Sequence, residues 1–179
     1  MILIAESGST KTDWRCVDSN KSTQQFFTAG FNPFHQNSSS IAAEIKSNLL
    51  PHLSGKIEKV FYYGAGCSSE KMCAVVLVAL KECFPGAEIS VEHDLLAAAR
   101  GLCRHEKGIA CILGTGSNSC VFDGKDITAN TPALGYILGD EGSGAHMGKK
   151  FVADYIIGEM PQNIATDFKT ETGLDKEKI

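Results

Sequence analysis

The sequence of 179 residues has no excess of basic charge and no long apolar run. Its formal net charge of -4 argues against a nucleic-acid binder, because such proteins usually present a basic face. No apolar stretch is long enough to cross a bilayer, and the short one before Glu6 is too brief for a signal peptide. We therefore expect a cytoplasmic protein without nucleic-acid or membrane partners.

Patterns that hold metals or disulfides are also missing. The seven cysteines are odd in number and include no C-x-x-C pair, so we expect reduced, mostly buried thiols. The five histidines have no metal-ligand spacing. Cys67 and Cys73 lie around an expected helix start, where packing on the helix face is favoured over ligation of a cluster. The first glycine-containing turn lacks the spacing of a Walker P-loop, which excludes that mechanism.

Two turns rich in glycine and hydroxyl groups are present instead. The apolar run 109–113 leads into Gly114–Ser117, and the apolar start of the chain leads into Gly8–Thr12. Small side chains let an anion approach the backbone N–H groups of such turns. Lys11 would add positive charge, with hydrogen bonds from Thr10 and Thr12. The repeated plan predicts two half-sites that face one polyphosphate.

Short apolar runs alternate with amphipathic stretches in the first part of the chain, which is typical of an α/β layer fold. We expect strands at 1–5, 13–18, 24–28, 59–64 and 89–91, with helices after 38–40, after 68–69 and after 93–94. The polar stretch 104–108 marks the expected domain boundary. Beyond it we expect a hairpin of 109–113 and 119–122, a loop at 130–133, a helix around 152–156 and a helix start at 174–179. The prediction is a first domain of residues 1–106 and an incomplete second domain of residues 107–179.

Two acidic positions carry alternative interpretations. Asp94 follows an expected strand and precedes a helix, so it is either an N-cap carboxylate or a general base at the strand end, and the two roles are compatible. Asp140 lies in a stretch with four glycines at 135, 139, 142 and 144. That stretch is either an acidic helix start or a backbone constrained by a ligand, since so many glycines weaken any regular element.

Together these motifs resemble the N-acetylglucosamine kinases and related activator ATPases of the sugar kinase, heat-shock-protein-70 and actin superfamily. Ala5–Trp14 resembles the first phosphate motif of the family, Gly114–Ser119 the second, and Leu138–Gly144 the loop on the substrate side. The resemblance extends to about residue 157. It implies ribonuclease-H-like domains that close over ATP·Mg²⁺ and an amino sugar.

The resemblance also implies roles for individual residues. Asp94 would be the base that accepts the proton of the sugar 6-hydroxyl. Contacts to the sugar would come from Asn32, Thr115 and Asp140. The phosphates would be held by Gly8, Ser9, Thr10, Lys11 and Thr12, with Gly116 and Ser117 opposite. Glu6 stands where the superfamily usually has Asp, and it would hold Mg²⁺ through water. Pro132-Ala133-Leu134 replace a glycine pair of some relatives, so the identity of the sugar stays open.

The first functional hypothesis is therefore an ATP-dependent kinase of N-acetylglucosamine or a close relative. An activator ATPase of the 2-hydroxyacyl-CoA dehydratase type and a non-catalytic sugar or nucleotide sensor stay open as alternatives, as does a homodimer. Because the adenosine-binding motif of the family is not among these residues, we expect the 179-residue segment alone to have negligible activity.

Overall fold

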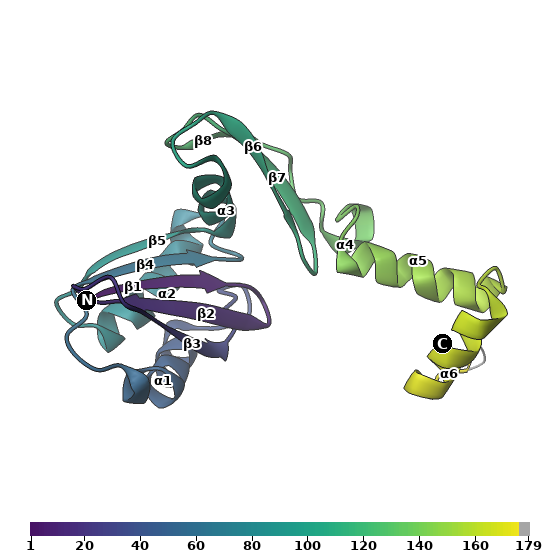
Figure 1. Cartoon of the computed structure of the whole chain (residues 1–179), viewed down its shortest axis with the longest axis horizontal. Helices are drawn as coiled ribbons and strands as arrows, with labels where there is room; N and C mark the ends of the chain where they lie inside the picture. The colour runs from purple at the N-terminus through teal and green to yellow at the C-terminus, as the bar shows by residue number, and fades with distance from the viewer. Residues whose placement is uncertain (176–179) are drawn as a thin grey trace.

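The computed structural model describes residues 1–175, which contain a five-stranded and a three-stranded sheet (Figure 1). The strand order of the first sheet is β3-β2-β1-β4-β5. Its strands are β1 Ile2–Ser7, β2 Lys11–Val17, β3 Thr23–Ala29, β4 Lys59–Gly64 and β5 Glu88–His93. The first three strands are antiparallel, whereas β4 and β5 run parallel to β1. The expected strand meander and strand–helix alternation are confirmed.

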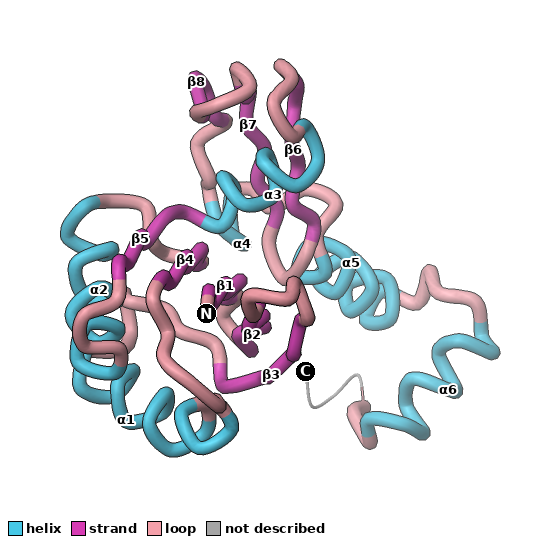
Figure 2. Tube along the Cα trace, turned by 60° about the vertical axis from the view of Figure 1, so that its left-hand side comes forward, coloured by secondary structure: helices cyan, strands magenta, loops and turns pink. Residues whose placement is uncertain are grey.

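The main core lies between this sheet and the helices α1 Ser38–Asn48 and α2 Glu70–Cys83. Side chains alternate along β1, so that Leu3, Ala5 and Ser7 are buried while the residues between them are exposed. Trp14 and Tyr62 fill the centre of this core. Figure 2 shows α1 and α2 on one face of the sheet and α3 (Asp94–Cys103) on the other.

The helix starts differ in detail from the expected ones. Asn37 caps α1, one residue before the expected cap region, and its side chain accepts a hydrogen bond from the Ser40 N–H. Ser69 caps α2 as expected. His93 occupies the N-cap position of α3, so Asp94 is the first helical residue and the N-cap interpretation of Asp94 is wrong. A short 3-10 helix, η1 Leu50–His52, follows α1 because a proline interrupts the helical pattern.

The second sheet has the order β6-β7-β8, with β6 Gly108–Leu113, β7 Ser117–Phe122 and β8 Ile127–Asn130. The hairpin was expected, but β8 was not. Helix α3 covers this sheet and forms a small second core with it, made of Leu95, Leu96, Ala99, Ala110, Cys120 and Phe122. Tyr63 of β4 joins this core, so α3 is packed between the two sheets.

Three helices follow, α4 Gly135–Leu138, α5 Gly144–Ile157 and α6 Gln162–Thr172, and they extend away from both sheets (Figure 1). The helix around 152–156 is thus confirmed, whereas α6 was not expected. The expected helix start at 174–179 is not present at Leu174 and Asp175, and its remainder lies outside the described residues. Within residues 1–175, no helix is both long and apolar enough to cross a membrane.

Candidate functional site

A cavity of about 390 Å³ lies between the two turns that the sequence singles out. All the candidate site residues except Asn32 and Thr12 line it. The lining residues are Glu6, Gly8, Ser9, Thr10, Lys11, Ala65, Asp94, Ile112, Gly114, Thr115, Gly116, Ser117, Asn118 and Asp140. The cavity is formed where the carboxyl ends of the parallel strands β1, β4 and β5 meet, which is where α/β sheets bind ligands.

Buried hydroxyl groups hold the base of the first turn. The Ser7 and Thr12 hydroxyls share a hydrogen bond of 2.7 Å, and Thr12 Oγ1 donates to the Ala29 carbonyl at 3.0 Å. Ser7 Oγ also accepts from the Phe31 N–H at 3.0 Å. Thr12 is fully buried. Its hydroxyl therefore shapes the turn from below and does not face the cavity.

Gly30 lies directly beneath the first turn. A Cβ at this position would lie 2.3 Å from the Gly8 carbonyl oxygen and 2.7 Å from the Lys11 nitrogen, distances that packed atoms do not tolerate. The Gly30 N–H donates to the Thr10 carbonyl at 3.0 Å. Only glycine lets the chain after β3 pass this close to the turn.

The second turn is held by the glycine-rich stretch that follows it. A carboxylate oxygen of Asp140 accepts from the Ser117 N–H at 3.1 Å, and a Cβ on Gly116 would lie 2.9 Å from the same oxygen. At the start of α5, the Gly144 N–H donates to the Gly114 carbonyl at 2.8 Å and the Ala145 N–H to the Thr115 carbonyl at 3.1 Å. The Ser117 N–H is therefore already paired with a carboxylate of the protein.

Asp140 itself has a left-handed backbone with φ of 61°. Such a conformation is uncommon for a residue with a side chain, and it clusters at functional sites. Ser143 is the N-cap of α5, and its side chain accepts a hydrogen bond from the His146 N–H. The interpretation of this stretch as a helix start is therefore confirmed at Ser143. The loop thus serves both to start a helix and to aim a carboxylate at the second turn.

Two carboxylates face the cavity, Glu6 from β1 and Asp94 from the residue after β5. Asp94 begins α3, and its Oδ1 lies 2.8 Å from the Leu95 nitrogen and 2.7 Å from His93 Nδ1. The pKa of Glu6 is raised by burial and then by the negative charges of Asp94 and Asp13, while Lys11 lowers it. The Lys11 ammonium lies 5.1 Å from the centre of the Phe27 ring. The site therefore concentrates negative charge that one lysine partly offsets.

Asn32 does not reach this cavity. Its Oδ1 accepts from the Phe34 N–H at 3.0 Å, and its backbone N–H donates to the Gln36 side chain at 2.8 Å. A Cβ on Gly66 would lie 2.8 Å from Asn32 Oδ1, so the side chain packs on the turn after β4. Asn32 thus shapes a loop in this arrangement.

Ala65 is a lining residue that sequence reasoning missed. It lies in a small-residue turn directly after β4, and its N–H donates to the Ser7 carbonyl at 2.8 Å. A glycine–alanine–glycine turn after a strand that runs parallel to β1 was the available signal. A second cavity of about 350 Å³ adjoins the first and shares Ile112, Ser117, Asn118 and Asp140 with it.

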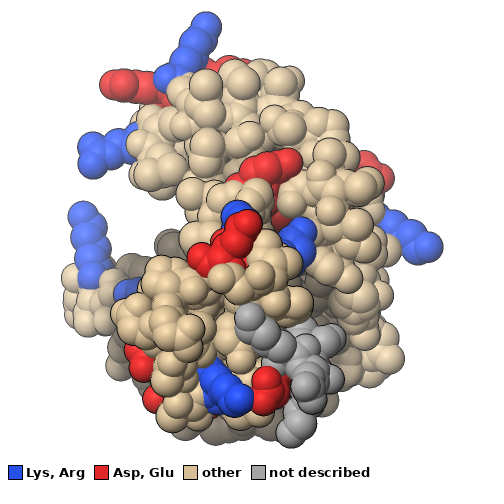
Figure 3. All heavy atoms as spheres, turned by 90° about the vertical axis from the view of Figure 1, so that its right-hand side faces the viewer, with Lys and Arg blue, Asp and Glu red and all other residues tan. Residues whose placement is uncertain are grey.

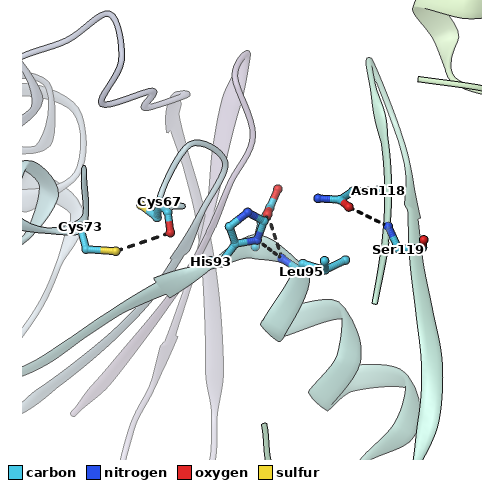
Figure 4. Close-up of polar contacts among 7 residues, drawn as sticks. Cys67, Cys73, His93, Leu95, Asn118 and Ser119 are labelled. Atoms are coloured by element: carbon cyan, nitrogen blue, oxygen red, sulfur yellow. Dashed lines mark hydrogen bonds and ion pairs between the residues drawn. The ribbon is translucent and has the colours of Figure 1, made fainter. Parts of the chain in front are cut away.

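The two cysteines considered as cluster ligands lie close together, Cys67 buried and Cys73 partly buried. Cys73 Sγ donates to the Cys67 carbonyl at 3.5 Å (Figure 4). Burial raises the pKa of Cys67 to about 12 and also raises that of Cys73. Among residues 1–175, no group of three or more His, Cys, Asp or Glu side chains is arranged to hold a metal ion. On the face seen in Figure 3, acidic and basic side chains are interspersed.

Comparisons with known proteins gave matches only among solved structures. Neither a scan of protein-family models nor a search of curated proteins found a match. A proposed N-acetylglucosamine kinase from Porphyromonas gingivalis has 47% sequence identity and a TM-score of 0.92, over 98% of this chain and 63% of that chain. A second proposed N-acetylglucosamine kinase, from Chromobacterium violaceum, has 16% identity and a TM-score of 0.72, over 96% of this chain and 64% of that chain.

A ROK family glucokinase from Streptomyces griseus, solved with glucose and AMPPNP, has 21% identity and a TM-score of 0.50, over 74% of this chain and 48% of that chain. The fold is thus the ribonuclease-H-like fold of actin-like ATPases and sugar kinases, as expected. Within that class, the resemblance to N-acetylglucosamine kinase-like proteins is confirmed. The chain spans less than two thirds of the length of each of these three proteins.

Proposed function

We propose that the chain carries the phosphoryl-transfer part of an ATP-dependent kinase that phosphorylates the 6-hydroxyl of an amino sugar similar to N-acetylglucosamine. The observation that carries this proposal is the cavity itself, which brings Asp94 together with both turns. The 47% identity to a proposed N-acetylglucosamine kinase supports the substrate class.

In the proposed reaction, Asp94 accepts the proton of the sugar 6-hydroxyl. The hydroxyl oxygen forms a bond to the γ-phosphorus of ATP, and the bond between that phosphorus and the β–γ bridging oxygen breaks, so that ADP leaves with the electron pair. Gly8, Ser9 and Thr10 hold the phosphates from one side, and Gly116 from the other. Lys11 offsets the charge of the phosphates and of the two carboxylates. Positioning and charge neutralisation supply most of the catalysis in such transfers.

The donor set fits a hydrated Mg²⁺ ion. Glu6 lines the cavity, and its pKa is raised first by burial and then by the negative charge of Asp94. A cation beside Glu6 would offset that charge, and carboxylate oxygens are the ligands that Mg²⁺ prefers. Glu6 would hold the ion through water. When bound, Mg²⁺ neutralises charge on the β- and γ-phosphates.

The proposed sugar contacts are Thr115 and the Asp140 carboxylate oxygen that does not pair with Ser117. Asn32 lies outside the cavity, so the proposal gives it no sugar contact in this arrangement. The domain division at residues 106 and 107 also belongs to the proposal. It falls in the loop between α3 and β6, although α3 packs on the second sheet.

The test is release of ADP with a panel of sugars. Since this chain spans 63% of the P. gingivalis protein, we expect negligible turnover by residues 1–179 alone. We expect turnover by a hybrid in which residues 1–175 continue into the remaining third of that protein. N-acetylglucosamine should be the preferred sugar, and Asp94→Ala should slow the hybrid by about 10²–10⁴-fold. Equal background with every sugar and an unchanged rate in Asp94→Ala would refute the proposal.

No observation in residues 1–175 favours the activator ATPase over the kinase. A cluster ligand must be a thiolate, and the raised pKa values of Cys67 and Cys73 oppose that form. Iron bound to protein purified without oxygen would revive this alternative. Tight sugar binding by the hybrid without any turnover would instead favour the sensor.

A further inference from the structure

His93 makes an unusual pair of contacts at the start of α3. Its Nδ1 lies 2.7 Å from Asp94 Oδ1 and 3.0 Å from the Leu95 nitrogen. The Leu95 N–H also lies 2.8 Å from the same Asp94 oxygen. Three polar atoms thus meet within hydrogen-bond distance, and the side chains of His93 and Asp94 are 29% and 21% exposed. Figure 4 shows His93 and Leu95 of this cluster, with Asn118 of β7 pointing toward them across the cavity.

The distance between His93 Nδ1 and Asp94 Oδ1 requires a proton on one of these two atoms. An imidazole nitrogen and a carboxylate oxygen 2.7 Å apart repel each other unless one of them carries a hydrogen. The proton belongs either to His93 Nδ1 or to Asp94. The first arrangement leaves Asp94 ionised with two donors on Oδ1, and the N-terminus of α3 favours that negative charge. The second would neutralise the group that must accept a proton from the substrate.

We infer that His93 is a positioning residue that, as the neutral Nδ1–H tautomer, clamps Oδ1 of Asp94 and leaves Oδ2 as the oxygen that takes the hydroxyl proton. The inference rests on the proposed kinase function, because it assigns the base of that reaction its reactive atom. Leu95 supplies the second donor from the backbone, so the carboxylate is held at one oxygen by two donors.

The clamp explains a feature that capping alone leaves open. An N-cap side chain needs only a lone pair aimed at the helix N–H groups, which Ser or Asn provides better than His. With hydrogen on Nδ1, His93 has no lone pair there for the Leu95 N–H 3.0 Å away, so in this tautomer the ring donates to the neighbouring carboxylate and the Leu95 N–H pairs with Asp94 Oδ1 alone. Orientation of a reacting group is worth a large factor in rate, and a misplacement of about 1 Å costs about 10²-fold.

The first arm of the test needs no turnover. Long-range ¹H–¹⁵N spectra of the chain with ¹⁵N-labelled histidine rings report which ring nitrogen of His93 carries hydrogen, with His93→Asn identifying its signal. We expect the Nδ1–H form in the unsubstituted chain and a change to the Nε2–H form in Asp94→Ala. An Nε2–H tautomer in the unsubstituted chain would overturn the inference, whether or not the protein is a kinase.

The second arm measures sugar phosphorylation by the hybrid protein. His93→Ala should lower kcat by about tenfold to a hundredfold with little change in KM for the sugar. His93→Asn should restore most of the rate, because its amide N–H can replace the Nδ1–H donor. The exposed His105→Ala is the matched control and should leave kcat unchanged. Equal kcat in His93→Ala and His93→Asn would refute the clamp, whereas a hybrid that phosphorylates no sugar would refute the proposed function and leave the spectra to decide on His93.

Discussion

The two sheets begin with the same strand–turn–strand plan, but they are enclosed to very different degrees. β1 pairs with a strand on each side and has Leu3 and Ala5 fully buried. In residues 1–175, β6 pairs only with β7, and Ile109 and Leu113 are 71% and 70% exposed. The first turn therefore stands on a complete core, whereas the second depends on local contacts.

The contacts that hold the two turns in place differ in the same way. Beneath the first turn, the buried hydroxyls of Ser7 and Thr12 and the close approach of Gly30 come from the sheet itself. The second turn is tied by Asp140 and by the first N–H groups of α5, which come from outside its sheet. Two similar glycine-containing turns can thus be fixed either by their own strand layer or by the loop and helix that follow.

The largest expected loss in the free energy of unfolding comes from a substitution in the enclosed region. Trp14 is fully buried between Phe31 and Tyr62, and its indole N–H donates to the Thr28 hydroxyl at 2.9 Å. Trp14→Ala should lower the free energy of unfolding by about 3–5 kcal/mol. Ile109→Ala, on the exposed face of β6, should change it by less than about 0.5 kcal/mol. Urea unfolding of both variants checks the contrast, and similar losses would contradict it.

The next largest loss in stability distinguishes a glycine at the first turn from a glycine at the second. Gly30→Ala should cost about 1–3 kcal/mol, because the new methyl group would press on the carbonyl of Gly8. A Cβ on Gly114 meets no other atom within 4 Å, so Gly114→Ala is the matched control with little loss. Thermal unfolding measures both. An equal loss in the two variants would show that the first turn is not held from below.

The sequence predicted the enclosed region better than the open one, for physical reasons. The expected strands 1–5, 13–18 and 59–64 contain the alternating or continuous apolar residues of a sheet with a complete core. In contrast, β8 is a four-residue strand with a single buried or partly buried position, and pairing with β7 decides its structure. α6 has no buried residue, and it is held through Phe168, whose ring packs on Phe151 and Tyr155.

Most of the predicted site residues line the cavity, whereas the contacts that hold the two turns could not be predicted from the sequence. Position 12 was assigned to the phosphates by its residue type, although the alternation through Trp14 and Cys16 places it on the buried face of β2. That signal was available. The contact of Asp140 with Ser117 spans 23 residues and needs a left-handed backbone, which neither spacing nor composition reveals.

A smaller effect tests the hydroxyl brace. Thr12→Val keeps the volume of the side chain but removes its bonds to Ser7 and to the Ala29 carbonyl. We expect a loss of about 1–2 kcal/mol in the free energy of unfolding, since buried hydrogen bonds are lost. Ser119→Ala removes the 3.3 Å hydroxyl contact with Thr131 at the exposed second sheet and should cost less than about 0.5 kcal/mol. Denaturant unfolding decides, and a costlier Ser119→Ala would reverse the comparison.

The last comparison concerns the thiols of the two regions, whose effect near neutral pH is small. Burial raises the pKa of Cys67 to about 12, whereas an unfolded thiol titrates near about 8.5. The protonated thiol therefore contributes stability that is fully present below about pH 8.5 and is lost as the pH rises toward 12, because the unfolded chain releases the proton first. The free energy of unfolding of Cys67→Ala should thus fall less steeply above about pH 8.5 than that of the unsubstituted chain.

Cys111 is exposed on β6, so iodoacetamide should label it long before Cys67 in the folded chain. Mass spectrometry of the peptides measures both labelling rates. Labelling of Cys67 as fast as Cys111 would mean that the turn after β4 opens as readily as the face of β6. The contrast between an enclosed and an open region would then fail at the edge of the candidate site.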